Sequence, residues 1–323
     1  MSDQPLLLGL DFGGTKLAAG LVDPKKGEVI ASERRATEPD GGAALALATM
    51  LTMARNLLPQ APDGVRGVGI NFGGPVDAGA GIVLRSHQVP GWDDFPLASR
   101  VSQALGLRTS LENDANGQAL AEWRFGAGRG SHAMAYLNIG TGIGGGVVLD
   151  GRLWRGAHGL AGEFGHMVIQ PGGPLCRCGR SGCLEALASG PAMGGRARAA
   201  LAALPSPVQL QNVMVKRAGG LDNVTGRELT AAAADGDALA VTVLDAIFGD
   251  LALGIVNVLN CIDPDLVVLG GGAADLAPSL FARLLVRVRS ICLPGTEDAI
   301  VLCPAALGPD TGIFGGAAVL LQP

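Results

Sequence analysis

The segment LLLGLDFGGTKLAAGLVD, residues 6–23, predicts the fold of the first part of the chain. Apolar residues 6–10 indicate a buried strand, DFGGTK at 11–16 a tight turn, and residues 17–22 a returning strand. A dinucleotide-binding glycine motif would have to join a strand to a helix instead. We therefore expect a β-hairpin.

The turn of this hairpin has the chemistry of a phosphate site. Gly13 and Gly14 lack Cβ atoms, so the backbone N–H groups around them can approach a phosphate closely. Thr15 adds a hydroxyl, and Asp11 is a suitable ligand for hydrated Mg²⁺. A glycine hairpin is also a common plain turn, so this segment by itself leaves both interpretations open.

The same plan recurs in AYLNIGTGIGGGVVLDG, residues 135–151, where a Gly-Thr-Gly turn at 140–142 separates an apolar strand from a returning one. Two related domains would then carry one phosphate-binding turn each. A third glycine cluster, residues 270–272, ends the apolar segment LVVL. It could admit the sugar and base of a nucleotide, or it could be an ordinary strand-to-helix turn.

Length and composition limit the class of protein. A chain of 323 residues predicts two domains, and 48% hydrophobic with 16% charged residues indicates a folded globular protein. A net charge of -5 gives no broad positive field, so we expect no nucleic-acid partner. The N-terminus lacks the features of a signal peptide, and we expect no apolar run to approach the roughly 20 residues of a membrane span. These features predict a cytoplasmic protein without a membrane partner.

Three of the six cysteines lie close together, at Cys176, Cys178 and Cys183, after His166. In the reducing cytosol, clustered cysteines favour metal binding or reactive thiols over disulfides. Three thiolates and one imidazole match a closed structural zinc site. Free thiols that are neighbours only in sequence are the alternative.

The acidic residues offer a catalytic base and ligands for hydroxyl groups. Asp114 follows Asn113 at the end of a short strand, where residues 115–125 take up helical spacing. Asp114 is either an N-cap or a base that accepts the proton of a substrate hydroxyl attacking a γ-phosphate, with Asn113 orienting that hydroxyl. Glu163 and Glu185 flank the cysteine cluster, where they could hold the paired hydroxyls of a polyol such as a sugar or be solvated surface acids.

Taken together, these motifs resemble those of the ROK family of sugar kinases over nearly the whole chain. The resemblance is carried by DFGGT at 11–15, LENDAN at 111–116, GTGIGGG at 140–146 and the H-x9-C-x-C-G-x2-G-C-x-E run at 166–185. The last run is the most specific of the four. The DFGGT turn alone would also suit actin or hexokinases.

The resemblance implies an α/β fold with two ribonuclease-H-like domains of the actin/hexokinase type and an interdomain cleft that binds ATP, Mg²⁺ and sugar. We expect a small N-terminal α/β domain of residues 1–118, joined by the C-terminal residues 305–323 with a helix at 311–322. Residues 119–304 would form a large α/β domain with the zinc loop 166–183.

The resemblance also assigns roles to residues of this sequence. Asp114 would be the catalytic base. Contacts with the sugar would come from Gly74, Asn113, Asp114, Glu163, His166 and Glu185. Contacts with the nucleotide and its metal would come from Asp11, Gly13, Gly14, Thr15, Lys16, Thr141, Gly142, Gly270, Gly271 and Gly272. The ligands of a structural Zn²⁺ would be His166, Cys176, Cys178 and Cys183.

We therefore expect an ATP-dependent hexose kinase that phosphorylates the 6-hydroxyl of glucose, and the relatives imply a homodimer. The chain departs from the family in SHQVPGW at residues 86–92, where many relatives read S-P-N-L-P-G-W with an asparagine beside the sugar. N-acetylglucosamine, N-acetylmannosamine, mannose or fructose as substrate, and polyphosphate as donor, remain open. A non-catalytic sugar sensor is the other alternative, against which the retained Asp114 and Gly13-Gly14-Thr15 argue.

Overall fold

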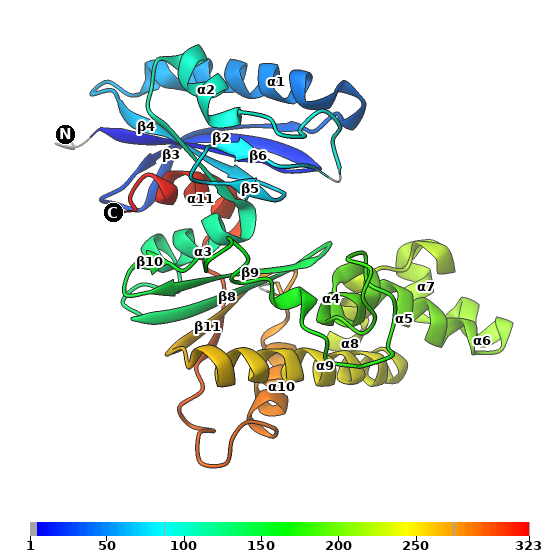
Figure 1. The fold of residues 1–323 in the computed structure, drawn as a ribbon. Coiled ribbons are helices and arrows are strands. Elements are labelled where there is room, and N and C mark those ends of the chain that lie inside the picture. The colour runs from blue at the N-terminus through cyan, green and yellow to red at the C-terminus, as the bar shows by residue number, and fades with distance from the viewer. Residues whose placement is uncertain (1–4, 87, 274, 323) are drawn as a thin grey trace. The chain divides into compact units, whose positions relative to one another are not determined.

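The computed structural model describes residues 5–86, 88–273 and 275–322 (Figure 1). The strands are β1 (Leu6–Phe12), β2 (Lys16–Asp23), β3 (Glu28–Ala36), β4 (Val65–Phe72), β5 (Val76–Asp77), β6 (Ile82–Val83), β7 (Thr109–Asn113), β8 (Ala133–Ile139), β9 (Ile143–Leu149), β10 (Arg152–Leu153), β11 (Leu266–Gly271) and β12 (Leu302–Pro304). The α-helices are α1 (Gly42–Leu57), α2 (Leu97–Leu105), α3 (Asp114–Phe125), α4 (Leu184–Ala188), α5 (Gly190–Ala202), α6 (Ser206–Gln211), α7 (Val213–Ala218), α8 (Gly226–Ala234), α9 (Ala238–Ile262), α10 (Pro278–Arg289) and α11 (Thr311–Val319). Single turns of 3-10 helix are η1 (Pro39–Gly41), η2 (Leu58–Gln60), η3 (Phe164–His166), η4 (Leu221–Asn223) and η5 (Gly308–Asp310).

The first sheet has the strand order β3-β2-β1-β4-β7. The β-hairpin expected from DFGGT is confirmed: β1 pairs antiparallel with β2, and the N–H of Gly13 donates to the carbonyl of Lys16 at 3.0 Å. On its other side β1 pairs parallel with β4, which pairs parallel with β7. The carboxyl ends of β1, β4 and β7 therefore meet at one edge of the sheet.

Helices cover both faces of this sheet, with α1 and α2 on one side and α11 on the other (Figure 1). The close approach of α11 depends on glycine in the strands. A Cβ atom on Gly9 of β1 would overlap the carbonyl of Ile313, and one on Gly69 of β4 would overlap the carbonyl of Gly316. Because neither glycine has a side chain, the helix backbone packs directly against the strand backbone.

The second sheet repeats the plan of the first, with the order β10-β9-β8-β11-β12. Strands β8 and β9 are neighbours, and the N–H of Gly140 donates to the carbonyl of Gly142 at 2.9 Å to close the turn between them. Strand β11 pairs parallel with β8, as β4 does with β1. The repetition expected from the two glycine hairpins is confirmed.

The chain forms two compact units. The first contains Met1–His132, Gly146–Ala161 and Ala306–Pro323, and the second contains Ala133–Gly145 and Gly162–Ala305. Helix α3 packs against α11 and β10 within the first unit.

A buried carboxylate fixes the C-terminal end of α3 within the first unit. Glu122 is 0% exposed. Its oxygens accept hydrogen bonds from the backbone N–H groups of Ala127 at 2.9 Å, Ala306 at 3.1 Å and Leu307 at 3.0 Å. The carboxylate therefore joins two loops that are far apart in the sequence.

Among the residues that the structure describes, two segments are long and apolar enough to cross a membrane by length and composition, Pro39–Gln60 and helix α9. The expectation that no apolar run approaches this length is therefore wrong for α9, which has 25 residues and a mean hydropathy of 2.0 in its most apolar window. Half of that window is buried, because α4, α5, α8 and α10 pack around the helix. Such burial is typical of a core helix in a globular protein.

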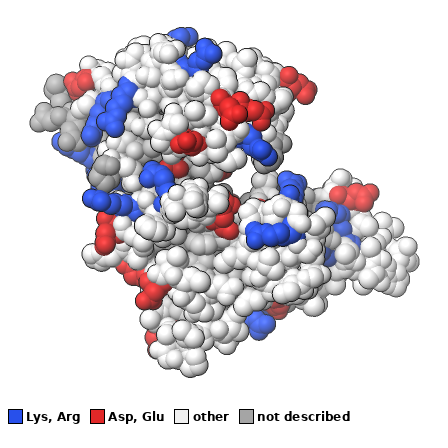
Figure 2. All heavy atoms as spheres, viewed as in Figure 1, with Lys and Arg blue, Asp and Glu red and all other residues white. Residues whose placement is uncertain are grey.

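Charge is mixed on the face of the molecule drawn in Figure 2. Lys and Arg side chains lie scattered there among acidic and uncharged residues. This face and the net charge of -5 offer no concentrated positive surface to a phosphodiester backbone. The lack of a nucleic-acid partner stays a prediction.

Candidate functional site

Asp114 lies where strand β7 ends and helix α3 begins. Asn113 is the N-cap of the helix: its Oδ1 accepts from the backbone N–H groups of Ala115 at 3.0 Å and Asn116 at 3.3 Å. Asp114 is the first helical residue, so the interpretation of Asp114 as the N-cap is wrong. Since Asn113 supplies the cap, the carboxylate of Asp114 is not required for it.

Three residues predicted to contact the sugar come together at this junction. The side-chain amide of Asn113 donates to the carbonyl of Gly74 at 3.0 Å and to Oδ1 of Asp114 at 3.1 Å. The N–H of Ala115 donates to the same Oδ1 at 2.9 Å. Among the described residues, no hydrogen bond reaches Oδ2 of Asp114. One oxygen is therefore fixed, and the other is available to a ligand.

The surroundings of Asp114 adjust its acidity. Burial first, and then the nearby negative charge of Asp11, raise the pKa of Asp114 to about 6 against the opposing effect of hydrogen bonds from Ala115 and Asn113. A carboxylate with a pKa close to neutrality is a stronger base than an ordinary aspartate and is still ionised at pH 7. It is suited to accept a proton from a hydroxyl group.

Asp11 is buried near the carboxyl end of β1. Asn71 on β4 donates from Nδ2 to Oδ1 of Asp11 at 2.9 Å. Burial raises the pKa of Asp11, and the hydrogen bond from Asn71 and the charge of Lys16 oppose this rise. A Cβ atom on Gly312 would overlap the carboxylate, so the first turn of α11 lies directly against Asp11. The positive end of the helix dipole favours the ionised form there.

Hydrogen bonds from Thr37 hold the DFGGT turn, and two of its backbone N–H groups are available to a ligand. Thr37 donates from Oγ1 to the carbonyl of Gly13 at 2.8 Å, and its N–H donates to the carbonyl of Thr15 at 3.0 Å. Within the described part of the chain, the N–H groups of Gly14 and Thr15 make no hydrogen bond. Gly13 and Gly14 line a small pocket together with Gly73. The turn thus offers free donors to an anion, as a phosphate site requires.

Lys16 follows this turn, and its Nζ lies 3.4 Å from the carbonyl of Pro309. Gln88 approaches the turn as well, because a Cβ atom on Gly14 would overlap its side chain. His87, part of the segment that departs from the family pattern, lies outside the described residues.

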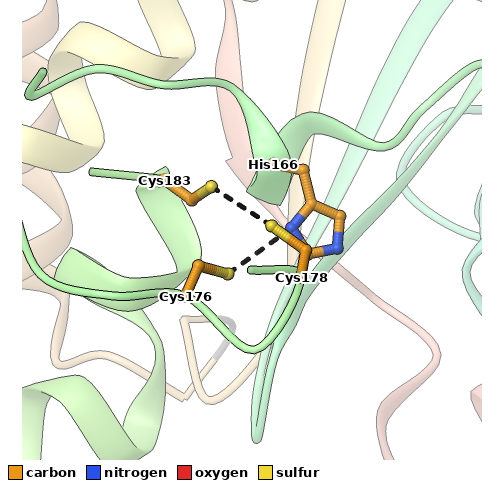
Figure 3. A group of neighbouring side chains, drawn as sticks. All are labelled: His166, Cys176, Cys178 and Cys183. Carbon is orange, nitrogen blue, oxygen red and sulfur yellow. Dashed lines mark hydrogen bonds between the residues drawn. The ribbon is translucent and has the colours of Figure 1, made fainter. Parts of the chain in front are cut away.

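In the second unit, the three cysteines and His166 point toward one another (Figure 3). Their four ligand atoms all lie within 4.8 Å of one another. Nδ1 of His166 lies 3.7 Å from Sγ of Cys176, and Sγ of Cys178 lies 3.6 Å from Sγ of Cys183. Zinc–sulfur bonds of about 2.3 Å in a tetrahedron place the sulfur atoms about 3.8 Å apart. The four residues therefore fit a zinc ion.

The backbone around the cluster explains how so short a loop gathers its ligands. Gly179 and Gly182 adopt positive φ angles of +87° and +81°, which glycine adopts without strain. The N–H of Cys176 donates to the carbonyl of Arg180 at 2.8 Å, which closes the loop. Cys183 then caps the start of α4.

The predicted acids lie beside this cluster. Nε2 of His166 is 3.8 Å from Oε2 of the exposed Glu163. Glu185 approaches Sγ of Cys176 with Oε1 at 3.8 Å, and its Oε2 accepts from the N–H of Ile143 at 2.9 Å. Glu163, His166 and Glu185 are thus brought together in the second unit, and Glu185 also reaches the turn that contains Thr141 and Gly142.

The third glycine cluster ends strand β11. Gly271 has a φ angle of +64°, and the N–H of Gly272 donates to the carbonyl of Ile139 at 2.8 Å. A Cβ atom on Gly270 would overlap the hydroxyl of Tyr136. Gly270 and Gly271 are therefore required for packing between β11 and β8, whether or not a nucleotide lies against them.

The sequence did not reveal that Glu112, the residue before Asn113, forms an ion pair. Glu112 is buried and pairs with Arg155, with 2.8 Å between Oε2 and Nε. The position of Glu112 directly before Asn113-Asp114 was a usable signal, since a buried charge needs a partner. Nothing in the sequence around Arg155 marks it as that partner.

Comparisons with known proteins agree over the whole chain. Residues 7–323 match the ROK family. A glucokinase from Thermotoga maritima is 34% identical over 318 residues, which cover 98% of this chain and 97% of that protein. The ROK hexokinase structure from Thermus thermophilus has a TM-score of 0.80 and 34% identity, with 97% of each chain covered. The structure of a ROK family glucokinase from Streptomyces griseus in complex with glucose and AMPPNP has a TM-score of 0.82 and 32% identity, with 97% of this chain and 98% of that chain covered.

These structures share the α/β fold of the actin/hexokinase type, and the fold class expected from the sequence is confirmed. The match at 34% identity over 98% of the chain extends from the first glycine hairpin through the cysteine loop to α11. The chain belongs to the ROK family.

Proposed function

We propose that this protein is an ATP-dependent glucokinase that transfers the γ-phosphate of ATP to the 6-hydroxyl of glucose. The observation that carries the proposal is the Asn113–Asp114 junction, where a carboxylate with a pKa of about 6 keeps one oxygen free beside Gly74. The full-length similarity to glucokinases supports glucose as the acceptor.

In this proposal Asp114 acts as general base. Oδ1 is fixed by Asn113 and Ala115, so Oδ2 accepts the proton of the sugar hydroxyl as the hydroxyl oxygen attacks the γ-phosphorus. Phosphoryl transfer depends mainly on positioning and on compensation of charge. A base that is ionised at pH 7 and held in one orientation meets the first requirement.

We propose that Gly74, Asn113, Asp114, Glu163, His166 and Glu185 contact the sugar hydroxyls. Structural Zn²⁺ would be bound by Nδ1 of His166 and the three thiolates, and its chemistry is to hold the loop in one shape. Ligation through Nδ1 directs Nε2 away from the metal, on the side of Glu163.

For the nucleotide, we propose that the N–H groups of Gly14 and Thr15 bind a phosphate, with Gly13, Lys16, Thr141 and Gly142 beside it. Asp11 would hold Mg²⁺ through its water ligands, and Mg²⁺ would neutralise charge on the phosphates. The glycines at 270–272 would lie on the adenosine side. We further propose a cytoplasmic homodimer with no nucleic-acid or membrane partner and with domain bounds near residues 118 and 304.

A kinase assay over a panel of sugars tests the proposal. Purified protein is offered glucose, mannose, fructose, N-acetylglucosamine and N-acetylmannosamine with ATP or polyphosphate, and ADP formation or loss of polyphosphate is measured. We expect the highest kcat/KM with glucose and ATP. A higher kcat/KM with another sugar contradicts the glucose assignment, and sugar binding without phosphorylation of any sugar favours the non-catalytic sensor.

A further inference from the structure

Glu112 is a buried carboxylate with four hydrogen-bond donors. It is 2% exposed. Its Oε2 accepts from Nε of Arg155 at 2.8 Å and lies 2.7 Å from Nη2 of the same guanidinium. Its Oε1 accepts from the backbone N–H of Asn113 at 3.0 Å and from Nδ2 of Asn116 at 3.1 Å. One oxygen thus binds the cation, and the other binds the junction between β7 and α3.

Arg155 is itself held in the first unit. The neighbouring Trp154 donates from its N–H to the carbonyl of Val147 at 2.8 Å. The carbonyl of Arg155 accepts a hydrogen bond from the N–H of Ala161 at 3.1 Å. This hydrogen bond closes the loop of residues 155–161. The guanidinium therefore comes from an ordered segment and is not a freely moving surface side chain, although it is 40% exposed.

We propose that Arg155 and Glu112 are positioning residues for the base, an inference that rests on the proposed function. Glu112 holds the backbone of Asn113, at the end of β7, and the side chain of Asn116, in the first turn of α3. These two residues lie on either side of Asp114. Arg155 neutralises Glu112, so that an ionised carboxylate remains buried at this point. Neither residue has to touch the substrate.

The physical reason is the cost of an unpaired buried charge. If the guanidinium is removed, Glu112 must take up a proton or move toward water. A protonated Glu112 accepts hydrogen bonds less strongly, and a displaced Glu112 releases Asn113 and Asn116. In either case the free oxygen of Asp114 loses its orientation, and misplacement of a catalytic group by about 1 Å lowers the rate about 10²-fold.

The charge on Glu112 should also affect how kcat/KM depends on pH. Asp11 on β1 is the charged group that acts on Asp114, and Lys16 acts in turn on Asp11. Glu112, paired with Arg155, precedes Asp114 by two positions at the end of β7. Helix α11, which packs against α3, has no charged residue. Where Glu112 moves toward water and keeps its charge after Arg155 is removed, that charge stands uncompensated two residues from Asp114. The acid limb of the kcat/KM profile then moves to higher pH.

The test compares Arg155→Met, Arg155→Lys, Glu112→Gln and the double variant Arg155→Met/Glu112→Gln with Arg152→Met, which removes an exposed arginine of β10 as a control. We expect Arg155→Met to lower kcat about 10- to 100-fold. Arg155→Lys keeps the charge and should lose less. The double variant has no buried charge to compensate, so its acid limb should return to the wild-type position and its kcat should exceed that of Arg155→Met.

Thermal unfolding measured on each variant separates folding from positioning. Arg155→Met that is folded at the assay temperature and keeps the kcat and acid limb of the wild type overturns the inference. An unshifted acid limb with kcat losses that multiply in the double variant overturns it as well. Wild-type protein that phosphorylates none of the tested sugars instead contradicts the proposed function.

Discussion

Oε2 of Glu185 accepts a hydrogen bond from the backbone N–H of Ile143 at 2.9 Å. Glu185 comes two residues after the cysteine that caps α4, and Ile143 begins β9, the returning strand of the second glycine hairpin. The loop that carries the three cysteines and this hairpin therefore form one frame in the second unit. Gly142 contributes to it, because a Cβ atom at that position would lie 2.5 Å from the same Oε2.

Glu185→Ala should weaken this frame. The N–H of Ile143 loses its acceptor, and hydrogen bonds to charged groups contribute about 1.5–3 kcal/mol. We expect a lower free energy of unfolding in urea and a higher KM for the sugar. Glu185→Gln keeps an acceptor oxygen and should be less destabilised, so equal effects of the two substitutions would argue against the hydrogen bond as the cause.

Asp114→Asn should abolish most turnover while the protein still binds sugar. The amide cannot accept the proton of the attacking hydroxyl, and loss of a general base lowers the rate about 10²–10⁴-fold. The measurement is kcat together with the sugar Kd from calorimetry. Asp77→Asn, which changes a carboxylate on β5, is the matched control. A kcat near the wild-type value in Asp114→Asn excludes Asp114 as the base.

The pKa of Asp114 predicts the pH dependence of the reaction. Because burial raises the pKa to about 6, the fraction of ionised Asp114 falls as the pH drops through 6. The rate should therefore be constant at neutral pH and decrease about tenfold for each pH unit below that value. The measurement is kcat/KM as a function of pH. An acid limb near pH 4, the value of an unperturbed aspartate, would contradict the prediction.

Metal analysis should find about one zinc ion per chain, because four ligands in a tetrahedron form a closed site. Cys176→Ser should lose the metal and the order of the loop, measured as zinc content and as hydrogen exchange over the loop. Cys261→Ser, which changes an exposed cysteine of α9 outside the cluster, should keep the metal. Protein that binds sugar but contains no zinc contradicts a structural zinc site.

Glu122→Gln should destabilise the first unit. The side-chain amide would turn its N–H groups toward backbone donors of Ala127 or Ala306, which now share the carboxylate. Unsatisfied buried donors cost about 1–3 kcal/mol each, so we expect a loss of about 2–4 kcal/mol in the free energy of unfolding. Glu28→Gln on the exposed strand β3 is the control, and an equal stability of both variants would contradict the prediction.

The features predicted correctly depend on neighbours in the sequence. Both glycine hairpins follow from apolar strands that flank a short glycine turn, since such turns form locally. The cluster of His166 with the three cysteines follows from cysteines a few residues apart in a glycine-rich loop. Helix α3 was expected at 115–125 and observed at Asp114–Phe125, but its cap was missed because Asn113 and Asp114 are both good cap residues.

The sequence by itself determined the two hairpins, the Cys/His cluster and the place of Asp114 at the start of α3, because each is encoded within one short segment. The tertiary structure decided which distant groups complete them. Arg155 meets Glu112 across 43 positions, and Ala306 meets Glu122 across 184. A buried carboxylate requires a hydrogen-bond donor or a cation nearby, but it does not specify which residue supplies it. The identity of the donor depends on how the strands and helices pack, and no local sequence pattern encodes this packing.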